Sequence, residues 1–316
     1  MIKRILVHIP TERPIRPVID ASISLAQQFG AELDALSLGY ISTGAAFVVE
    51  GAAATVLAAN LDLEERPAAE RTAAALAVFD IAARNAGVPY RSHSIEGIPA
   101  DAADAIGAAA RLHDLSVVLQ PDVDHYTFDN TISRDILLQA GGPVLFVPYI
   151  FNGPFQPKRI GICWDGSRLA SRALRDAHPF LARANYLCAL SIDASDTTPA
   201  EASLEKLGEY LTHGNCSVQC LGHGVLLVFG APSQHPIAGG AGARPGHPIN
   251  GQPTRLVDMP GVGIDIQPLI LSLAADENLD MLVLGAYGHS PLREDILGGV
   301  TRAMMQTMTL PTLMSH

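Results

Sequence analysis

The sequence predicts an α/β protein made of two tandem doubly wound parallel-sheet domains with flavodoxin-like, Rossmann-like layering. Short apolar runs alternate along the chain with longer segments of helical periodicity. This pattern restarts after a Gly/Pro-rich stretch near the middle of the sequence. The length of 316 residues also suits two domains, since a domain commonly has about 150 residues.

The first domain, residues 1–150, is expected to alternate strands with helices from its beginning. Strands are predicted where apolar residues run without interruption, and helices where such residues recur every three or four positions. Gly30 and Gly87 mark the ends of two of these helices. Pro89 suggests that the third strand begins there or lies at an edge of the sheet. In chain order we expect strands at 5–9, 31–38, 88–95, 115–119 and 143–147, and helices at 15–29, 61–86, 100–113 and 133–140.

Residues 151–157 are expected to form a linker, because glycine, proline and asparagine are frequent there. The second domain, residues 158–316, then repeats the first. Its first strand, residues 158–164, echoes residues 2–8, so two copies of one α/β unit are the economical interpretation. In chain order we expect strands at 158–164, 186–192, 216–221, 281–284 and 309–314, and helices at 167–184, 200–212, 264–277 and 300–305.

One segment of the second domain, residues 222–263, does not follow the repeat. It is rich in glycine and proline and has weak periodicity. Structureless loops of this length are uncommon in compact domains and are usually functional or disordered. The composition favours disorder or a loosely packed excursion, although residues 225–229 could add a short edge strand.

The composition excludes several classes of protein. A net charge of −11 and the absence of a basic patch argue against a general nucleic-acid binder. No apolar run reaches the roughly 18 residues that a membrane span needs, and the N-terminus resembles a strand rather than a secretion signal. We therefore expect a cytoplasmic protein that binds neither nucleic acid nor membrane.

The cysteines indicate reduced thiols rather than disulfides or zinc. Cys163 and Cys188 lie in apolar strand-like runs, where buried thiols are expected. The four residues that could suggest a zinc site have a spacing that fits no usual zinc knuckle, namely His213, Cys216, Cys220 and His223. We predict no metal site.

The most informative stretch is the glycine-rich connection after the buried run at 281–284. Gly285, Gly288, Gly298 and Gly299 permit close backbone approach, and a helix is predicted from residue 300. Free amides and the dipole at a helix N-terminus favour an anion, and open α/β sheets bind ligands at the carboxyl ends of their strands. The structural alternative is a tight strand-to-helix connection. It is not a P-loop, because Gly-Lys-Ser/Thr occurs nowhere.

The spacing Gly285-x2-Gly288-x9-Gly298 resembles the nucleotide-binding signature of the universal stress protein family, Gly-x2-Gly-x9-Gly followed by Ser or Thr. Gly299 stands at the hydroxyl position, and the nearest hydroxyl belongs to Thr301. The resemblance covers nearly the whole chain as a tandem pair, with the signature in the second copy alone. It implies an adenine nucleotide α-hydrolase-like fold and ATP as ligand, with Mg²⁺ as a candidate companion. The phosphate contacts that it implies come from Gly285, Gly288, Gly298, Gly299 and Thr301.

Asp165 follows the first strand of the second copy. The resemblance implies that this carboxylate contacts the adenosine end of the nucleotide. The alternative is that Asp165 and Ser167 cap the helix that follows, since both residue types are preferred there. The sequence leaves both interpretations open.

In the first copy, residues 120–130 stand in the place of the glycine loop. They contain no glycine and include Asp122, Asp124 and Asp129, so an incoming triphosphate would meet bulk and like charge. We expect no ATP binding there without a metal. A solvated acidic loop is favoured over a cation site, because the glycine and distal glutamate of a calcium loop are missing.

These observations predict a universal-stress-type, stress-response or regulatory protein whose second domain binds an adenine nucleotide. No general base or metal cluster is evident, so hydrolysis is expected to be slow and incidental, and an enzyme is not expected. The alternative is a nucleotide-independent scaffold whose acidic surface or 222–263 segment binds a protein partner, an interpretation that Gly299 favours. The sequence leaves homodimer formation open.

Overall fold

The computed structural model places two α/β units along the chain, residues 1–156 and 157–316, called unit 1 and unit 2 below. The division falls within the predicted linker, residues 151–157. The structure describes residues 1–40, 54–97, 99–122, 124, 127–190, 206–208, 210–211, 226–230, 243–249, 252–257, 266–286 and 300–316. The predicted strand at 216–221, most of the helix at 200–212 and the zinc-like residues lie outside these ranges.

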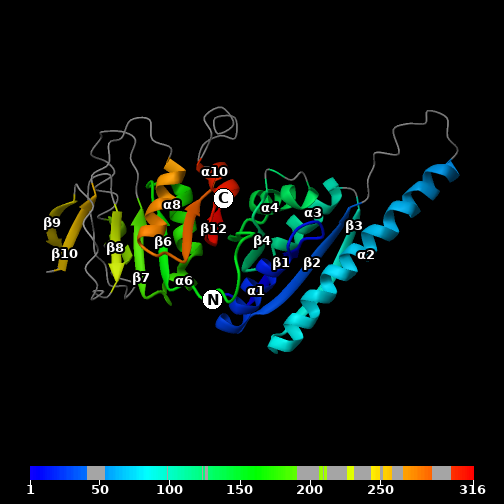
Figure 1. The fold of residues 1–316 in the computed structure, drawn as a ribbon, viewed down its shortest axis with the longest axis horizontal. Coiled ribbons are helices and arrows are strands. Elements are labelled where there is room, and N and C mark those ends of the chain that lie inside the picture. Colours follow the sequence, from blue (N-terminus) through cyan, green and yellow to red (C-terminus); the bar gives the residue numbers. More distant parts are fainter. Residues whose placement is uncertain are drawn as a thin grey trace. The chain divides into compact units, whose positions relative to one another are not determined.

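Unit 1 is built on a parallel sheet with the strand order β3-β2-β1-β4-β5 (Figure 1). Its strands are β1 (Arg4–Ile9), β2 (Glu32–Tyr40), β3 (Tyr90–Gly97), β4 (Leu115–Leu119) and β5 (Val144–Val147), and its helices are α1 (Arg16–Phe29), α2 (Ala54–Ala86), α3 (Pro99–Ala110) and α4 (Phe128–Gln139). The central strands β1 and β4 are almost wholly buried, as their apolar runs predict. β3 lies at an edge and is more exposed, in agreement with the position of Pro89.

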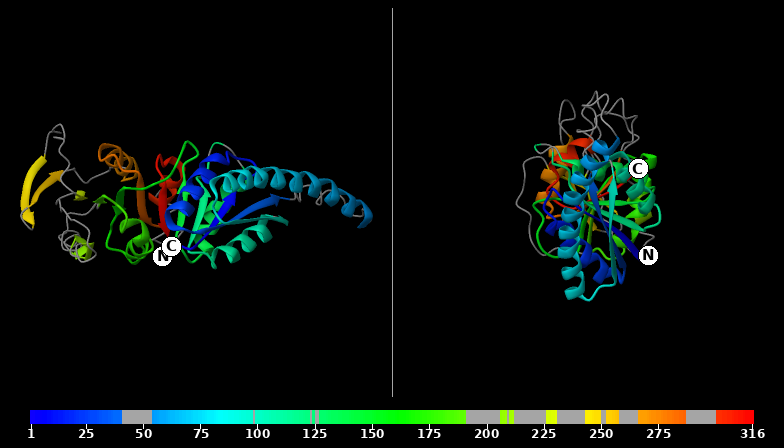
Figure 2. Two further views of the ribbon diagram at one scale, coloured as in Figure 1. Left: turned by 90° about the horizontal axis from the view of Figure 1, so that it is seen from below. Right: turned by 90° about the vertical axis from the view of Figure 1, so that its right-hand side faces the viewer.

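The helices of unit 1 form two layers. α1 and α2 contact each other and strands β1 and β2, whereas α3 and α4 contact each other and cover the opposite face. Figures 1 and 2 both show α2 alongside β2 and β3. α1 ends where the sequence predicts, because Gly30 adopts the left-handed φ of 65° and donates its N–H to the Ala26 carbonyl. Unit 1 is therefore doubly wound.

Unit 2 repeats this strand order as β8-β7-β6-β11-β12, in which β6 corresponds to β1 and β11 to β4. Its main sheet and helices are β6 (Arg159–Cys163), α5 (Arg168–Asp176), α6 (His178–Leu181), β7 (Tyr186–Leu190), β8 (Leu226–Gly230), α8 (Ile266–Asp276), β11 (Met281–Gly285), α10 (Val300–Thr307) and β12 (Thr312–Ser315). β6, β7, β11 and β12 are parallel, but the edge strand β8 runs antiparallel to β7. The prediction of parallel sheets therefore holds for all of these strands except β8.

A shared contact at the amino ends of the central strands supports the internal repeat. In unit 1, Asp114 Oδ2 accepts hydrogen bonds from the amides of residues 3 and 4, at 2.7 and 3.0 Å. In unit 2, Asp280 Oδ2 accepts them from the amides of residues 158 and 159, at 2.9 and 3.1 Å. Each aspartate directly precedes the central strand that pairs with the first strand, so the same contact aligns both pairs.

Two predicted helices differ in the structure. The helix expected at 167–184 is divided into α5 and α6, because Pro179 in the second segment has no N–H for a continuous ladder. The helix expected at 133–140 begins earlier, at Phe128. Its first turn contains Asp129 and Asn130, which the sequence predicts to lie in the loop before the helix.

The 222–263 segment also contains more regular structure than its composition predicts. β8 lies in it as the edge strand that residues 225–229 suggested. β9 (Ala243–Ile249) and β10 (Gln252–Val257) form a separate antiparallel pair. The expectation of disorder is wrong for these three strands, whereas the alternative of a loosely packed excursion stays a prediction. Backbone pairing, rather than hydrophobic periodicity, defines them.

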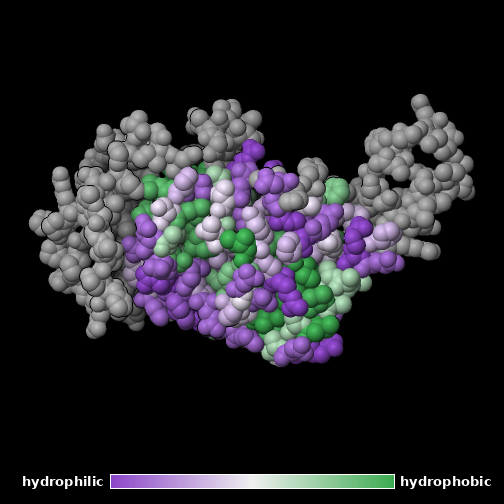
Figure 3. All heavy atoms as spheres, in the orientation of Figure 1, coloured by the Kyte–Doolittle hydropathy of each residue, from purple (hydrophilic) through white to green (hydrophobic). Residues whose placement is uncertain are grey.

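In the described ranges, no helix is long and apolar enough to span a bilayer. Figure 3 shows hydrophilic residues over much of the described surface on that face, with smaller hydrophobic areas between them. Large apolar side chains that are exposed come from several separate elements and loops: Met1, Ile81, Leu112, Leu138, Tyr149, Ile150 and Tyr210. These residues alone do not define one apolar docking surface.

Candidate functional site

The candidate site lies at the carboxyl ends of β6 and β11 in unit 2. These strands are parallel neighbours, with Ile160 opposite Met281 and Ile162 opposite Val283. The strand order reverses between them, since β7 and β8 follow on one side and β12 on the other. In an open α/β sheet this reversal is where ligands bind. Asp165 and Gly285, predicted separately from sequence, both lie at this edge.

The loop after β6 supports the cap interpretation of Asp165. Its Oδ1 accepts a hydrogen bond from the Ser167 amide at 2.9 Å, and Ser167 Oγ accepts one from the Ala170 amide at 3.1 Å. Ser167 is thus the N-cap of α5. Gly166 has a φ of 74°, which allows the tight turn between them. Asp165 is also exposed, so a ligand at this edge of the sheet can reach its carboxylate.

Gly285 has a packing role of its own. A Cβ at this position would lie 2.6 Å from the main-chain nitrogen of Ala170 and 2.6 Å from the main-chain carbon of Leu169. Both atoms belong to the first turn of α5, where backbone cannot move aside cheaply. A glycine is therefore required for α5 to pack against β11, whether or not a ligand binds.

The remaining predicted residues are distributed over the loop and the helix after it. Thr301 is buried in the first turn of α10. Gly288, Gly298 and Gly299 lie outside the described residues, so their phosphate contacts stay predictions. The described part of the site thus consists of the ends of β6 and β11, the capped start of α5 and the start of α10.

Cys163 is buried directly before this loop and is a free thiol, as is Cys188. This confirms the sequence prediction for both residues. Burial, and then the charge of Asp165, raises the pKa of Cys163 to about 12. The thiol therefore stays protonated at neutral pH, and a protonated thiol is a weak nucleophile.

The equivalent edge of unit 1, at the carboxyl ends of β1 and β4, is arranged differently. Asp129 Oδ2 accepts hydrogen bonds from the main-chain amides of Thr11 and Glu12, at 2.9 and 2.8 Å. Glu12 Oε2 in turn accepts one from the Phe128 amide at 3.1 Å. The side chain of Asp129 is 3% exposed. The prediction that this acidic stretch is a solvated loop is therefore wrong for Asp129, because the residue folds onto the end of β1.

Arg13 contacts two further residues of that stretch, Asp122 and Asn130. Its Nη1 atom lies 3.3 Å from Asp122 Oδ2 and donates a hydrogen bond to Asn130 Oδ1 at 3.0 Å. Asn130 Oδ1 also accepts the Asp122 amide at 2.9 Å. Asp124 alone of the three aspartates is exposed. Among the described residues, no group of three or more His, Cys, Asp or Glu side chains is placed to hold a metal ion.

Sequence reasoning missed His8, which lies in β1 beside this carboxylate. Its Nε2 is 3.6 Å from Asp129 Oδ1, and its side chain is 1% exposed. Neither ring nitrogen of His8 has a hydrogen-bond partner, nor does Asp129 Oδ1. A histidine inside an otherwise apolar strand was the available signal, since buried polar side chains are uncommon without a partner.

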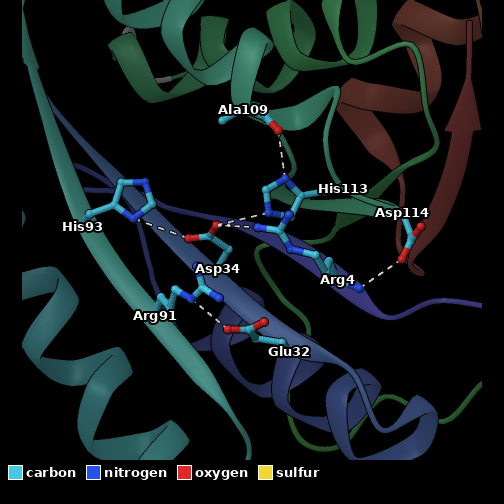
Figure 4. A network of polar contacts seen from close by, with 8 residues as sticks. All are labelled: Arg4, Glu32, Asp34, Arg91, His93, Ala109, His113 and Asp114. Atoms are coloured by element: carbon cyan, nitrogen blue, oxygen red, sulfur yellow. Dashed lines mark hydrogen bonds and ion pairs between the residues drawn. The ribbon is translucent and has the colours of Figure 1, made fainter.

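A further polar network in unit 1 lies near the amino ends of its strands (Figure 4). His113 Nδ1 lies 2.8 Å from the Ala109 carbonyl oxygen, and His113 Nε2 lies 3.2 Å from Asp34 Oδ2. His93 Nδ1 and Arg4 Nη2 lie 3.4 and 3.6 Å from the same carboxylate. The network connects β1, β2 and β3 with the residues before β4, at the edge opposite to the one where α/β sheets bind ligands. Its role is therefore structural.

Comparison with known proteins connects this arrangement to a family. Residues 257–316 match the model of the universal stress protein family. This range includes β11, the glycine-rich connection, α10 and β12. No curated protein sequence matches the chain.

Solved structures match over nearly the full length. A universal stress protein from Archaeoglobus fulgidus DSM 4304 is 13% identical and aligns with 98% of this chain and 95% of its own, at a TM-score of 0.63. A putative universal stress protein from Pseudomonas aeruginosa UCBPP-PA14 is 14% identical over 99% and 93% of the two chains, at a TM-score of 0.53. A functionally unknown protein from Pseudomonas aeruginosa PAO1 is 13% identical over 99% and 92%, at 0.54.

Matches to half of the chain include a universal stress protein solved in complex with cAMP, which is 17% identical over 46% of this chain and 97% of its own, at a TM-score of 0.31. At these identities the full-length likenesses show the fold. Residues 257–316 are therefore similar to the universal stress protein family, and the chain shares the fold of these solved structures over nearly its whole length, as two tandem α/β units.

Proposed function

We propose that this protein binds one adenine nucleotide in unit 2 and acts as a nucleotide-responsive regulatory protein rather than as an enzyme. The observation that carries the proposal is that Asp165 and Gly285 lie at the carboxyl ends of two neighbouring strands, where the strand order reverses. Gly285 also begins the Gly-x2-Gly-x9-Gly spacing, inside the range that matches the family model. In this proposal the glycine loop and Thr301 hold the phosphates, and Asp165 contacts the adenosine end.

Unit 1 is not expected to bind the nucleotide. At its corresponding edge, Asp129 already accepts hydrogen bonds from the amides of Thr11 and Glu12. A phosphate approaching those amides would meet a buried carboxylate of the same sign. One nucleotide per chain is therefore the expected stoichiometry, with ATP as the first ligand to test and Mg²⁺ as its companion.

The test starts with the freshly purified protein, which is denatured and examined for released ATP, ADP or AMP. The emptied protein is then titrated with ATP and Mg²⁺ by calorimetry. Gly288→Val and Asp165→Ala are expected to abolish binding without unfolding the protein, which far-UV circular dichroism checks. Asp124→Ala is the matched control, because it removes an exposed carboxylate after β4 of unit 1. Unchanged affinity in both unit 2 variants would contradict the site.

A second candidate function is a nucleotide-independent scaffold. The contact between Gly285 and the α5 backbone favours it, because this glycine is explained by packing alone. The capping role of Asp165 favours it as well. If no nucleotide is released and titration gives no heat, the scaffold is preferred. Partner capture with the full chain and with a variant lacking residues 222–263 would then show whether that segment binds a protein.

A further inference from the structure

The end of β1 in unit 1 presents two main-chain amides to a single carboxylate oxygen. Thr11 N and Glu12 N donate to Asp129 Oδ2 at 2.9 and 2.8 Å. Asp129 comes from the first turn of α4, more than a hundred residues later in the chain. The Glu12 side chain accepts the Phe128 amide in return. The two segments thus satisfy each other's free amides.

This position is one where α/β proteins bind external anions. The strand order of unit 1 reverses between β1 and β4, and the amino end of α4 lies at the carboxyl ends of these strands. Free amides and the helix dipole favour negative charge there. In unit 1 the chain itself supplies that charge.

The carboxylate occupies this position at an energetic cost. Asp129 Oδ1 has no hydrogen-bond partner, and the adjacent His8 ring, 3.6 Å away, has none at either nitrogen. Burial raises the pKa of Asp129 to about 6, although the amide hydrogen bonds act in the opposite direction. One carboxylate oxygen of Asp129 is therefore bound as an external anion would be, and the other faces the His8 ring without a hydrogen bond.

The repeat shows which residue of unit 2 has the corresponding position. The buried residues of α4 begin with Asp129, Ile132 and Ser133, and those of α10 with Thr301, Met304 and Met305. In each helix the first of them is the second residue, so Thr301 corresponds to Asp129. The carboxylate is thus a feature of unit 1, and unit 2 has a neutral hydroxyl in its place.

We propose that Asp129 is an internal anion that fills an oxyanion site of unit 1, and that removal of its side chain opens this site to a small oxyanion such as formate. The site consists of the amides of Thr11 and Glu12, the first turn of α4 and the His8 imidazole. The proposal does not depend on nucleotide binding in unit 2, since every contact that carries it lies in unit 1.

The experiment is chemical rescue of Asp129→Ala in the full-length protein. Its Tm is measured at pH 7 while sodium formate replaces sodium chloride at constant ionic strength. We expect the variant to have a lower Tm than the wild type and to gain Tm with formate in a saturable manner, because a ligand that binds only the folded state stabilises it. The wild type is expected to show no saturable gain, because its own carboxylate fills the site.

Two control variants separate an anion site from a general salt effect. Asp129→Asn keeps the side-chain volume and a carbonyl acceptor, so it should leave no room for formate. Asp114→Ala also removes a carboxylate bound by two amides, but at an exposed position, so it should show no saturable rescue. If Asp129→Ala does not fold in chloride, the yield of refolded protein in formate replaces Tm as the readout.

Absence of a formate-specific gain in both Tm and refolding yield would overturn the proposal, as would an equal gain in the wild type. A nucleotide titration of Asp129→Ala distinguishes this result from the function proposed for unit 2. If formate raises the Tm of Asp129→Ala and this variant binds as much nucleotide as the wild type, the internal anion is supported. This conclusion holds whether or not the wild type binds nucleotide.

Discussion

The imidazole Nε2 of His8 lies 3.6 Å from Oδ1 of Asp129, and both side chains are almost fully buried. Burial affects the two groups in opposite directions. It lowers the pKa of His8 from 6.5 to about 4, and it raises the pKa of Asp129 from 3.8 to about 6. Both groups are therefore driven toward their neutral forms over much of the same pH range.

This pair predicts a compensated pH dependence of stability. Between about pH 4 and 6.5 the unfolded state binds more protons at His8, so that contribution to stability rises with pH. Between pH 3.8 and about 6 the folded state binds more protons at Asp129, so that contribution falls as pH rises. Asp129→Asn removes the second contribution. We expect its free energy of unfolding, measured in urea, to increase between pH 4.5 and 7 by about 2 kcal/mol more than that of the wild type.

Asp124→Asn is the control for this measurement, because that carboxylate is exposed. Its stability profile should follow the wild-type curve. Identical pH profiles for Asp129→Asn and the wild type would show that the pair does not titrate as described.

His8 and His113 are both buried histidine side chains of unit 1, and the same substitution is expected to have opposite effects at the two positions. His8 has no hydrogen-bond partner at either ring nitrogen. His113, which is 3% exposed, contacts both the Ala109 carbonyl and Asp34. Replacing an unpartnered polar group by an apolar one removes a desolvation cost, whereas replacing a bonded group leaves its partners unsatisfied. We expect His8→Leu to raise the free energy of unfolding by about 1 kcal/mol at pH 7 and His113→Leu to lower it by about 1–3 kcal/mol.

Denaturant titrations of both variants and the wild type check this prediction. If the free energy of unfolding falls by a similar amount in both variants, His8 must form stabilising contacts comparable to the hydrogen bonds of His113.

Gly285 predicts a stability defect that is separate from ligand binding. A Cβ there would approach the backbone of Leu169 and Ala170 to 2.6 Å. Forcing an additional atom into packed backbone typically costs about 1–3 kcal/mol. We expect Gly285→Ala to lower Tm even without nucleotide. Gly142→Ala is the control, because its nearest atom would be the His113 carbonyl oxygen at 3.8 Å. Equal Tm values for the two variants would show that α5 can move away from β11.

Local sequence features were sufficient to predict the elements that depend on burial and backbone propensity. Buried strands such as β4 appear as uninterrupted apolar runs, and α1 ends at Gly30 because that residue adopts a left-handed φ. Asp165 and Gly285 could be placed at one edge of a sheet because parallel neighbours share the direction of their carboxyl ends. The internal repeat could be seen because its first strand is similar in both copies.

Contacts between distant residues could not be predicted in this way. The sequence predicts a solvated acidic loop that includes Asp129. The burial of Asp129 depends on amides at residues 11 and 12, which only the fold brings to it. The packing role of Gly285 also depends on a helix more than a hundred residues earlier, so the signature alone could not separate packing from ligand binding.

Two substitutions at the N-terminus of α5 can separate a role of Asp165 in helix capping from a role in nucleotide binding. Ser167 Oγ accepts the Ala170 amide, and Asp165 Oδ1 accepts the Ser167 amide. Ser167→Ala removes the N-cap acceptor, which should cost about 1 kcal/mol of stability. Asp165→Asn keeps a side-chain oxygen for the turn but removes the charge, so its Tm should stay near the wild-type value. If Asp165 contacts the adenosine end of a nucleotide, calorimetry should show at least tenfold weaker ATP binding in Asp165→Asn. Full affinity in Asp165→Asn, with a reduced Tm in Ser167→Ala, would assign this loop to helix capping alone.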